Sequence, residues 1–138
     1  MLRAEKALPL LSKLQPPALQ SGLILRARLI EMLNAGQAGK LTLISASTGF
    51  GKTTLACAWT KKCGRPVAWL TLDELDNEPR RFLTHFIRAM QVSQREFGAD
   101  LIENLKTVQP GAISAEPGAL TEALIAEIAV LQTAFLFI

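Results

Sequence analysis

The chain contains no tyrosine, one histidine and two cysteines among its 138 residues. Cys57 and Cys63 lack the spacing of a metal site and have no histidine near them, so we expect reduced thiols and no metal centre there. No apolar run reaches the roughly 18 residues that a membrane span requires. The N-terminal residues do not resemble a secretory signal peptide. We therefore expect a cytoplasmic protein without a membrane partner.

The positive charge of the chain is small and dispersed. The net charge of +3 comes from short clusters such as Lys61 with Lys62 and Arg80 with Arg81. No recognition helix, zinc knuckle or aromatic and basic stripe accompanies these pairs, so nothing in this sequence indicates direct contact with DNA. Apolar residues make up 49% of the chain, which suits a folded domain of average size.

A glycine-bearing loop lies between an apolar run, residues 41–45, and the start of an amphipathic segment. In a strand–loop–helix context such a loop directs successive backbone N–H groups at phosphate oxygens, and the positive end of the helix dipole adds to them. The sequence therefore predicts a phosphate-binding loop of the Walker A type. Its predicted contact residues are Ala46, Ser47, Thr48, Gly49, Phe50, Gly51, Lys52, Thr53 and Thr54.

Two side chains of this loop have specific predicted roles. Lys52 should reach the outer phosphates of a nucleotide, and the Thr53 hydroxyl should ligate Mg²⁺. The first position of the motif is Ala46 rather than glycine, which is acceptable where the backbone φ is negative. A Gly-x-Gly-Lys-Thr segment can also close an ordinary turn, but the expected strand before it and helix after it favour nucleotide binding.

The spacing of apolar residues predicts an α/β chain with parallel strands. Helices are expected over about residues 25–36, 52–62, 79–90 and 99–105 and after Pro117-Gly118, and strands over 41–45, 67–72 and 134–138. The first two strands should share a sheet through a right-handed crossover. We expect residues 1–38 to form an arm and a helix that pack on a partial nucleotide-binding domain, residues 39–138. A turn is expected at Pro110-Gly111.

An acidic segment follows the second expected strand, and the residues leave two interpretations open. Asp73 and Glu74 could serve as Walker B acids, which would make the chain a small autonomous P-loop kinase or phosphohydrolase. The same segment could instead be a solvated acidic loop, with the Mg²⁺-side carboxylate following the strand at 134–138, beyond Ile138. His85 is expected on a partly buried helix face.

Several segments together resemble the MalT-like branch of the large LuxR-type transcriptional regulators. The resemblance covers about residues 10–138, is weakest between 92 and 118, and is most specific at the Leu-Asp-Glu-x-Asp-Asn element. The segments that carry it are Leu11-Ser-Lys-Leu14 with Pro16-Pro17, Leu25-Arg-Ala-Arg-Leu29, the loop at 45–54, and Trp69 to Asn77 followed by Pro79-Arg-Arg-Phe-Leu83.

This resemblance implies a STAND-class P-loop switch ATPase with a three-layer fold. In such regulators ATP and an inducer stabilise an oligomer that recruits polymerase through a C-terminal helix-turn-helix. The run at 134–138 looks like the start of the strand that carries their Asp-Asp Walker B pair. The resemblance therefore implies an ATP-binding N-terminal fragment in which Walker B, the inducer-binding repeats and the DNA-binding domain lie outside this chain. DNA and inducer would be contacted only through those absent parts.

Two further expectations follow from the same resemblance. Arg26 falls where the family has an arginine near the nucleotide base, although a plain surface arginine fits the residue equally well. About three strands of a sheet of about five are present, which favours self-association through uncovered edges. Hydrolysis should be negligible without the catalytic carboxylates, and a truncated product with no function of its own remains a third interpretation.

Overall fold

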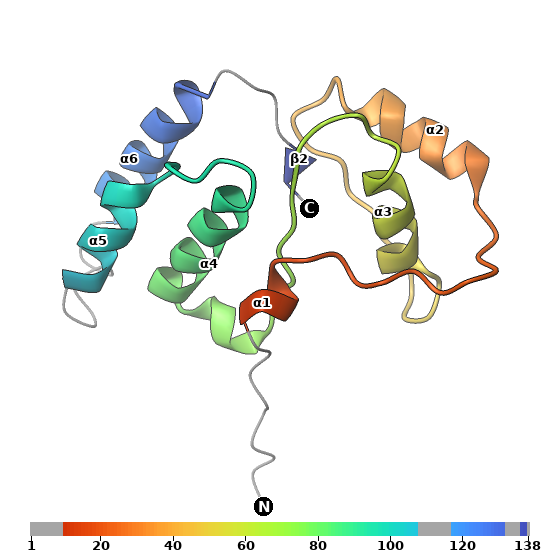
Figure 1. The fold of residues 1–138 in the computed structure, drawn as a ribbon, viewed down its shortest axis with the longest axis horizontal. Helices are drawn as coiled ribbons and strands as arrows, with labels where there is room; N and C mark the ends of the chain where they lie inside the picture. Colours follow the sequence, from red (N-terminus) through yellow and green to blue (C-terminus); the bar gives the residue numbers. More distant parts are fainter. Residues whose placement is uncertain (1–9, 108–116, 132–135, 138) are drawn as a thin grey trace, which may run out of the picture.

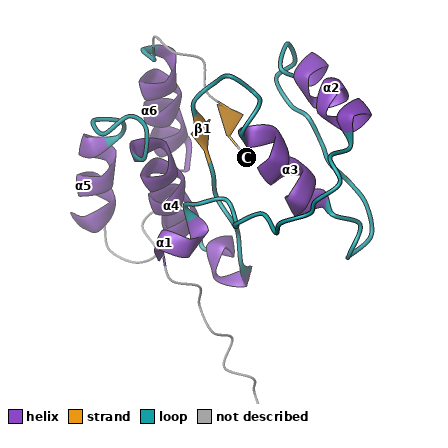
Figure 2. Cartoon of the chain, turned by 45° about the vertical axis from the view of Figure 1, so that its right-hand side comes forward, coloured by secondary structure: helices purple, strands orange, loops and turns teal. Residues whose placement is uncertain are grey.

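A computed structural model of the chain describes residues 10–107, 117–131 and 136–137. Helices dominate these residues, and the two short strands lie between the helices in the middle of the molecule (Figures 1 and 2). The elements are α1 (Leu10–Lys13), α2 (Ala27–Gly36), α3 (Lys52–Thr60), β1 (Val67–Ala68), the 3-10 turn η1 (Glu74–Asn77), α4 (Pro79–Gln91), α5 (Ala99–Thr107), α6 (Pro117–Ala129) and β2 (Leu136–Phe137).

The strands β1 and β2 pair in parallel, with Val67 opposite Leu136 and Ala68 opposite Phe137. Helices α4, α5 and α6 lie on one side of this pair, and α2 and α3 lie on the other (Figures 1 and 2). Parallel strands are generally covered on both faces in this way because their connections carry helices. The described part of the chain thus has two groups of helices with β1 between them.

Side chains of the β1 segment alternate between hydrophobic clusters on its two sides, as expected for extended backbone. Ala68 is fully buried in a large cluster with residues of α4 and α5, and Leu70 belongs to the same cluster. Val67 packs against a smaller cluster formed by α2 and α3. The large cluster consists of Leu14, Ala68, Leu70, Ile87, Ala89, Met90, Phe97, Leu101, Ile102 and Leu105.

The predicted helices are confirmed with small shifts at their ends. Helix α4 begins at Pro79, whose missing N–H suits a first helical position. The Glu78 carboxylate accepts hydrogen bonds from the amides of Arg80 and Arg81 at 3.0 and 2.7 Å, which satisfies two of the free donors at this end. Helices α2 and α3 are joined by the Trp59 indole, which donates to the Asn34 amide oxygen at 2.7 Å.

The predictions for the strands are partly wrong. Residues 41–45 form no strand, and the Leu41 and Leu43 side chains are 87% and 83% exposed. The second expected strand is reduced to Val67–Ala68, and its partner is β2 rather than residues 41–45. A strand exists only where a neighbouring backbone completes its hydrogen bonds, and among the described residues only β1 and β2 provide such a pair. The P-loop three-layer fold therefore remains a prediction.

Parts of several predictions lie outside the described residues. These are the arm up to residue 9, the turn at Pro110-Gly111, and residues 134, 135 and 138 of the last expected strand. Within the described part of the arm, Leu14 is buried in the large cluster, whereas Leu10 and Leu11 are exposed. Cys57 and Cys63 are both free and buried.

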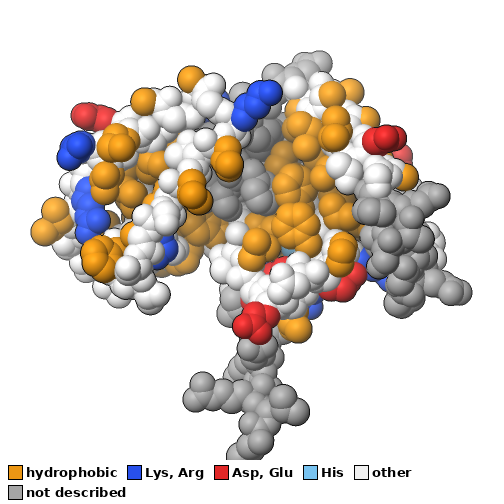
Figure 3. Space-filling view, turned by 180° about the vertical axis from the view of Figure 1, so that it is seen from behind, with side chains coloured by type: hydrophobic (Ala, Val, Ile, Leu, Met, Phe, Trp, Pro, Cys, Tyr) orange, Lys and Arg blue, Asp and Glu red, His pale blue; other side chains and the backbone are white. Residues whose placement is uncertain are grey.

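Hydrophobic side chains also reach the surface of both groups of helices, as seen from behind in Figure 3. The most exposed are Ile24, Leu41, Leu43, Leu11, Val130 and Phe50. No helix among the described residues is both long enough and apolar enough to cross a bilayer.

Ile87 tests the importance of the large cluster, since its side chain is only 1% exposed. We expect Ile87→Ala to lower the free energy of unfolding by about 2–5 kcal/mol, because the lost apolar contacts leave a cavity. Urea denaturation measures this change. Ile125→Ala is the matched control, since Ile125 is exposed on α6 and its loss should cost below about 0.5 kcal/mol. Equal costs for the two variants would contradict the assigned core.

Candidate functional site

The loop before α3 is a compact turn. The Phe50 amide donates to the Ser47 carbonyl oxygen at 3.3 Å. Gly49 and Gly51 have φ values of +85° and +76°, a region that side-chain-bearing residues rarely adopt. Gly51 is also the N-cap of α3, where it has no side chain to occupy the free N–H groups of the first helical turn. The two glycines thus turn the backbone into the helix and leave these donors accessible.

Ala46 fits the first position of the loop as the sequence predicted. No residue other than glycine has a positive φ in the described ranges 10–107, 117–131 and 136–137, so alanine is not strained at this position. Ala46, Ser47 and Thr48 are exposed at the surface.

The Lys52 side chain folds back over the loop. Its ammonium group donates to the carbonyl oxygens of Ala46 and Ser47 at 2.7 and 3.0 Å. Because Lys52 is also the first residue of α3, its charge lies at the helix end that carries the positive dipole. The loop therefore combines a cation with free backbone donors, which is an arrangement suited to an anion.

Arg26 approaches the same loop from a distant part of the chain. It is the N-cap of α2, and its guanidinium donates to the Phe50 carbonyl oxygen at 3.4 Å. The predicted contact residues at 46–54 and Arg26 are thus brought together. Of the two threonines, Thr53 is exposed at the start of α3, and Thr54 is partly buried.

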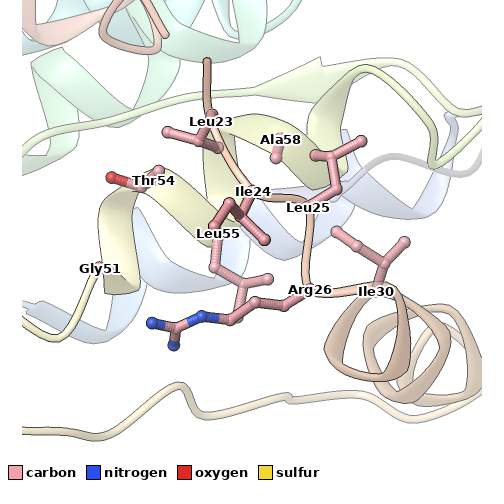
Figure 4. Close-up of a pocket in the computed structure, with 9 residues that line it drawn as sticks. All are labelled: Leu23, Ile24, Leu25, Arg26, Ile30, Gly51, Thr54, Leu55 and Ala58. Carbon is pink, nitrogen blue, oxygen red and sulfur yellow. The ribbon is translucent and has the colours of Figure 1, made fainter. Parts of the chain in front are cut away.

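A largely apolar pocket of about 370 Å³ lies beside the start of α3 (Figure 4). The segment leading into α2 forms one wall, and α3 forms the other. Its lining residues are Leu23, Ile24, Leu25, Arg26, Ile30, Gly51, Thr54, Leu55 and Ala58. A second pocket of about 310 Å³ shares Arg26, Gly51 and Leu55 with the first and includes Ala46 and Lys52 in its wall. Arg26 thus lies where an apolar pocket meets the cationic loop.

The acidic segment after β1 has a different structure from the solvated loop that was one of our expectations. The Asp73 carboxylate accepts from the Leu75 amide at 3.0 Å, and the Asp76 carboxylate accepts from the Asp73 amide at 2.9 Å. This reciprocal capping box begins the turn η1. Asp76 is buried, so the interpretation as a solvated acidic loop is wrong for this residue.

A buried ion cluster forms around these two carboxylates. The Lys13 side chain is fully buried, and its ammonium lies 2.8 Å from Asp73 Oδ2 and also pairs with Asp76 Oδ2. The other oxygen of Asp76 lies 3.2 Å from Arg81 Nε and 2.7 Å from His85 Nδ1. His85 does lie on a partly buried helix face, as expected, but its partner Asp76 was not predicted.

The cluster keeps both carboxylates charged. Burial acts to raise the pKa of Asp76, yet hydrogen bonds from Lys13, the Asp73 amide and His85 outweigh it and hold the pKa well below its usual range. The hydrogen bond from Lys13 likewise lowers the pKa of Asp73. Asp73 is thus engaged by Lys13 and by its capping role in this structure, and its use as a Walker B acid remains a prediction. Glu74 is exposed.

One feature of the sequence does indicate part of this cluster. The spacing of Asp73 and Asp76 is that of a capping box, which predicts a short helical turn rather than an open loop. The burial of Lys13 has no comparable signal, because a lysine in a short leucine-rich segment normally indicates the protein surface.

Comparison with known proteins shows relatives over part of the chain. The serine/threonine-protein kinase PknK of Mycobacterium tuberculosis is 40% identical over 83 residues, which is 58% of this chain and 8% of PknK. The HTH-type transcriptional regulator MalT of Yersinia enterocolitica is 38% identical over 82 residues, 59% of this chain and 9% of that protein. MalT of Serratia proteamaculans is 37% identical over 83 residues, with the same coverage of 59% and 9%.

The chain is similar to part of MalT. This supports the family resemblance seen in the sequence, at the level of a shared segment. The chain spans less than a tenth of the length of these curated relatives. No family model matches the chain, and no solved structure matches it either. The expected truncation before Walker B is not tested by these similarities and remains a prediction.

The ion cluster predicts how stability depends on pH. Because folding lowers the pKa of Asp76, the unfolded chain binds the proton at higher pH, and the free energy of unfolding should fall as the pH drops below about 5. We expect Asp76→Asn to be less stable at pH 7 and to lose much of this acid dependence. Chemical denaturation between pH 7 and pH 3 measures both effects.

Glu103→Gln is the control for this experiment, since Glu103 pairs with Lys106 in an exposed ion pair of 3.0 Å. It should retain the slope of the unmodified chain, because exposed pairs contribute little. An identical acid dependence in Asp76→Asn and the unmodified chain would show that Asp76 does not carry it.

Proposed function

We propose that this chain is a nucleotide-binding segment of a MalT-type transcriptional regulator, with ATP and Mg²⁺ as its ligands. In the whole protein the segment would act as an ATP-dependent switch. The observation that carries the proposal is the turn through Gly49 and Gly51, which opens directly into α3 and places Lys52 over the loop. Such a loop at a helix N-terminus is suited to the phosphates of a nucleotide.

The geometry indicates how the phosphates would be held. Free N–H groups of the loop and the first turn of α3 would donate to phosphate oxygens. The Lys52 ammonium now donates to two backbone carbonyl groups, and a phosphate would offer it stronger, charge-assisted hydrogen bonds. The exposed Thr53 hydroxyl would ligate Mg²⁺, as the motif implies.

The pocket beside Gly51 supports a nucleotide rather than free phosphate. Its volume of about 370 Å³ falls within the range of small-ligand pockets, and its walls are mostly apolar side chains. A base needs such walls, whereas phosphate does not. Arg26, which lies between this pocket and the loop, would bridge the base end and the phosphate end of one ligand.

The names of the relatives also support a switch. One relative is named a serine/threonine-protein kinase and another an HTH-type transcriptional regulator, yet both are similar to part of this chain. A segment common to two such proteins is better explained by nucleotide-dependent control than by phosphotransfer to protein or by DNA contact. We accordingly propose that DNA and inducer are bound elsewhere in the whole regulator. Exposed Leu41 and Leu43 would favour self-association of this segment.

Lys52→Ala tests the phosphate site. Removing a charged hydrogen-bond donor should weaken ATP binding by about 1.5–3 kcal/mol, which is about one to two orders of magnitude in Kd. Isothermal titration calorimetry with ATP and Mg²⁺ measures the affinity. Lys62→Ala, which removes an exposed lysine just beyond α3, should bind as the unmodified chain does. Equal affinities in Lys52→Ala and Lys62→Ala would reject the loop as the site.

Thr53→Val tests the magnesium ligand, because valine keeps the shape of threonine and removes only the hydroxyl group. We expect the gain in ATP affinity on adding Mg²⁺ to shrink in this variant. Binding of ATP in the presence of EDTA should not change. Calorimetry with and without Mg²⁺ separates the two quantities. A full magnesium effect in Thr53→Val would remove Thr53 from the metal site while leaving the phosphate loop in place.

A further inference from the structure

Residues 14–26 form a strap that connects the two groups of helices. Figure 1 shows it running from α1 past the lower end of α3 and then to α2. At its first end Leu14 is buried in the large cluster with α4 and α5. Leu19 packs partway along against residues of α2 and α3. The last four residues, 23–26, line the pocket beside Gly51.

Lys13 anchors the first end of the strap through both its backbone and its side chain. Its carbonyl oxygen accepts from the Thr71 amide at 2.9 Å, just after β1. Its fully buried ammonium pairs with Asp73 and Asp76. Burying an ammonium group is costly unless its partners are well placed, so this side chain has one favourable position in the fold. The anchor is therefore specific to the position of η1.

The strap between the anchor and the pocket is short, and two prolines restrain its first half. Residues 15–18 are exposed and belong to no helix or strand. Two of them are Pro16 and Pro17, whose rings fix φ near about −65° and favour an extended, semi-rigid chain. A connection restrained in this way carries the position of Lys13 to Leu19, which packs against α2 and α3. A flexible connection would not. From Leu19 a turn at Ser21 and Gly22, whose φ is +81°, leads into the pocket wall.

We propose that Lys13 is a positioning residue for the nucleotide pocket. Its ion pairs with Asp73 and Asp76 hold the strap, and the strap holds the pocket wall at residues 23–26 in the form that accepts the base. This inference rests on the proposed function. It gives the ion cluster the role of holding the pocket wall in place, which is separate from the role of the phosphate loop. The test therefore needs one measurement that reports on the pocket wall and one that reports on nucleotide binding.

The fraction of molecules with a correctly placed wall determines how much the apparent Kd changes. If the wall is correctly placed in only about one tenth of the molecules, the apparent Kd for the nucleotide rises about tenfold. Lys13→Met removes the charge but keeps a long apolar side chain. We expect this variant to bind ATP with Mg²⁺ about tenfold more weakly and to show faster amide hydrogen exchange over residues 19–26. Lys106→Met is the matched control, because it removes the same charge from an exposed ion pair and should change neither quantity.

A second variant leaves every buried residue in place. Pro16→Gly with Pro17→Gly keeps the Lys13 ion pairs but makes the strap flexible. Glycine gives the unfolded chain more conformational freedom than proline, so we expect this variant to unfold at a moderately lower temperature than the unmodified chain. We also expect it to bind ATP about threefold more weakly, since about a third of the molecules would keep the wall in place. If Lys13→Met fails to fold, this double variant decides the question alone.

The outcomes separate this inference from the function on which it rests. If the unmodified chain binds no ATP, the proposed function fails, and the role of Lys13 in it fails as well. If the unmodified chain binds ATP and the variants bind it equally well, only the role of Lys13 is overturned. Weaker binding in both variants, with faster exchange over residues 19–26 and unchanged behaviour of Lys106→Met, supports the inference.

Discussion

Val67 and Ala68 are neighbours in the chain, but their side chains enter hydrophobic clusters on opposite sides of β1. Ala68 joins the large cluster with α4 and α5, and Val67 packs against α2 and α3. This burial on both faces fixes where the two groups of helices lie relative to each other. Pairing with β2 completes the backbone hydrogen bonds of β1 on one edge. The candidate site depends on this arrangement, because the phosphate loop and the ion cluster lie on segments that flank β1 in the chain.

Helices were predictable because their signals are local. Pro79 at a first helical position and the apolar spacing of α4 are properties of a few neighbouring residues, and helix α4 begins where they indicate. Strands depend on partners that sequence spacing does not identify. Residues 41–45 have the composition of a strand, yet Leu41 and Leu43 remain exposed, and no neighbouring backbone among the described residues pairs with them. The pairing of β1 with β2 joins segments far apart in the sequence.

The residues of the candidate site and of the ion cluster also differ in whether their signals in the sequence are local. The loop residues are contiguous, so the motif alone located Gly51 and Lys52 at the start of α3. The position of Arg26 came from the family resemblance. The structure places its guanidinium 3.4 Å from the Phe50 carbonyl oxygen, and its role near a nucleotide base remains a prediction. The ion cluster escaped prediction because Lys13 and Asp76 are 63 positions apart and a lysine in a short leucine-rich segment normally indicates surface. Only the fold brings such charges together.

The ion cluster and the phosphate loop also complement each other electrostatically. Two carboxylates, Asp73 and Asp76, are matched by the charges of Lys13 and Arg81, so the cluster carries little net charge. Neutralised in this way, Asp73 and Asp76 do not oppose an anionic ligand. The unpaired cations of the candidate site are then Lys52 and Arg26, whose hydrogen bonds go to neutral carbonyl groups of the loop. Their charge is therefore available to phosphate.

Thermodynamic linkage gives the strap a further significance. Coupling between two sites is reciprocal, so if the anchored strap favours a nucleotide, as we propose, the nucleotide must favour the anchored strap to the same degree. The pocket walls belong to α3 and to the segment entering α2, whereas the anchor of Lys13 lies on η1, which packs against α4. A nucleotide held beside α2 and α3 would thus strengthen the ion cluster beside α4. Such a coupling is what a switch requires, since occupancy at one place changes the stability of contacts at another.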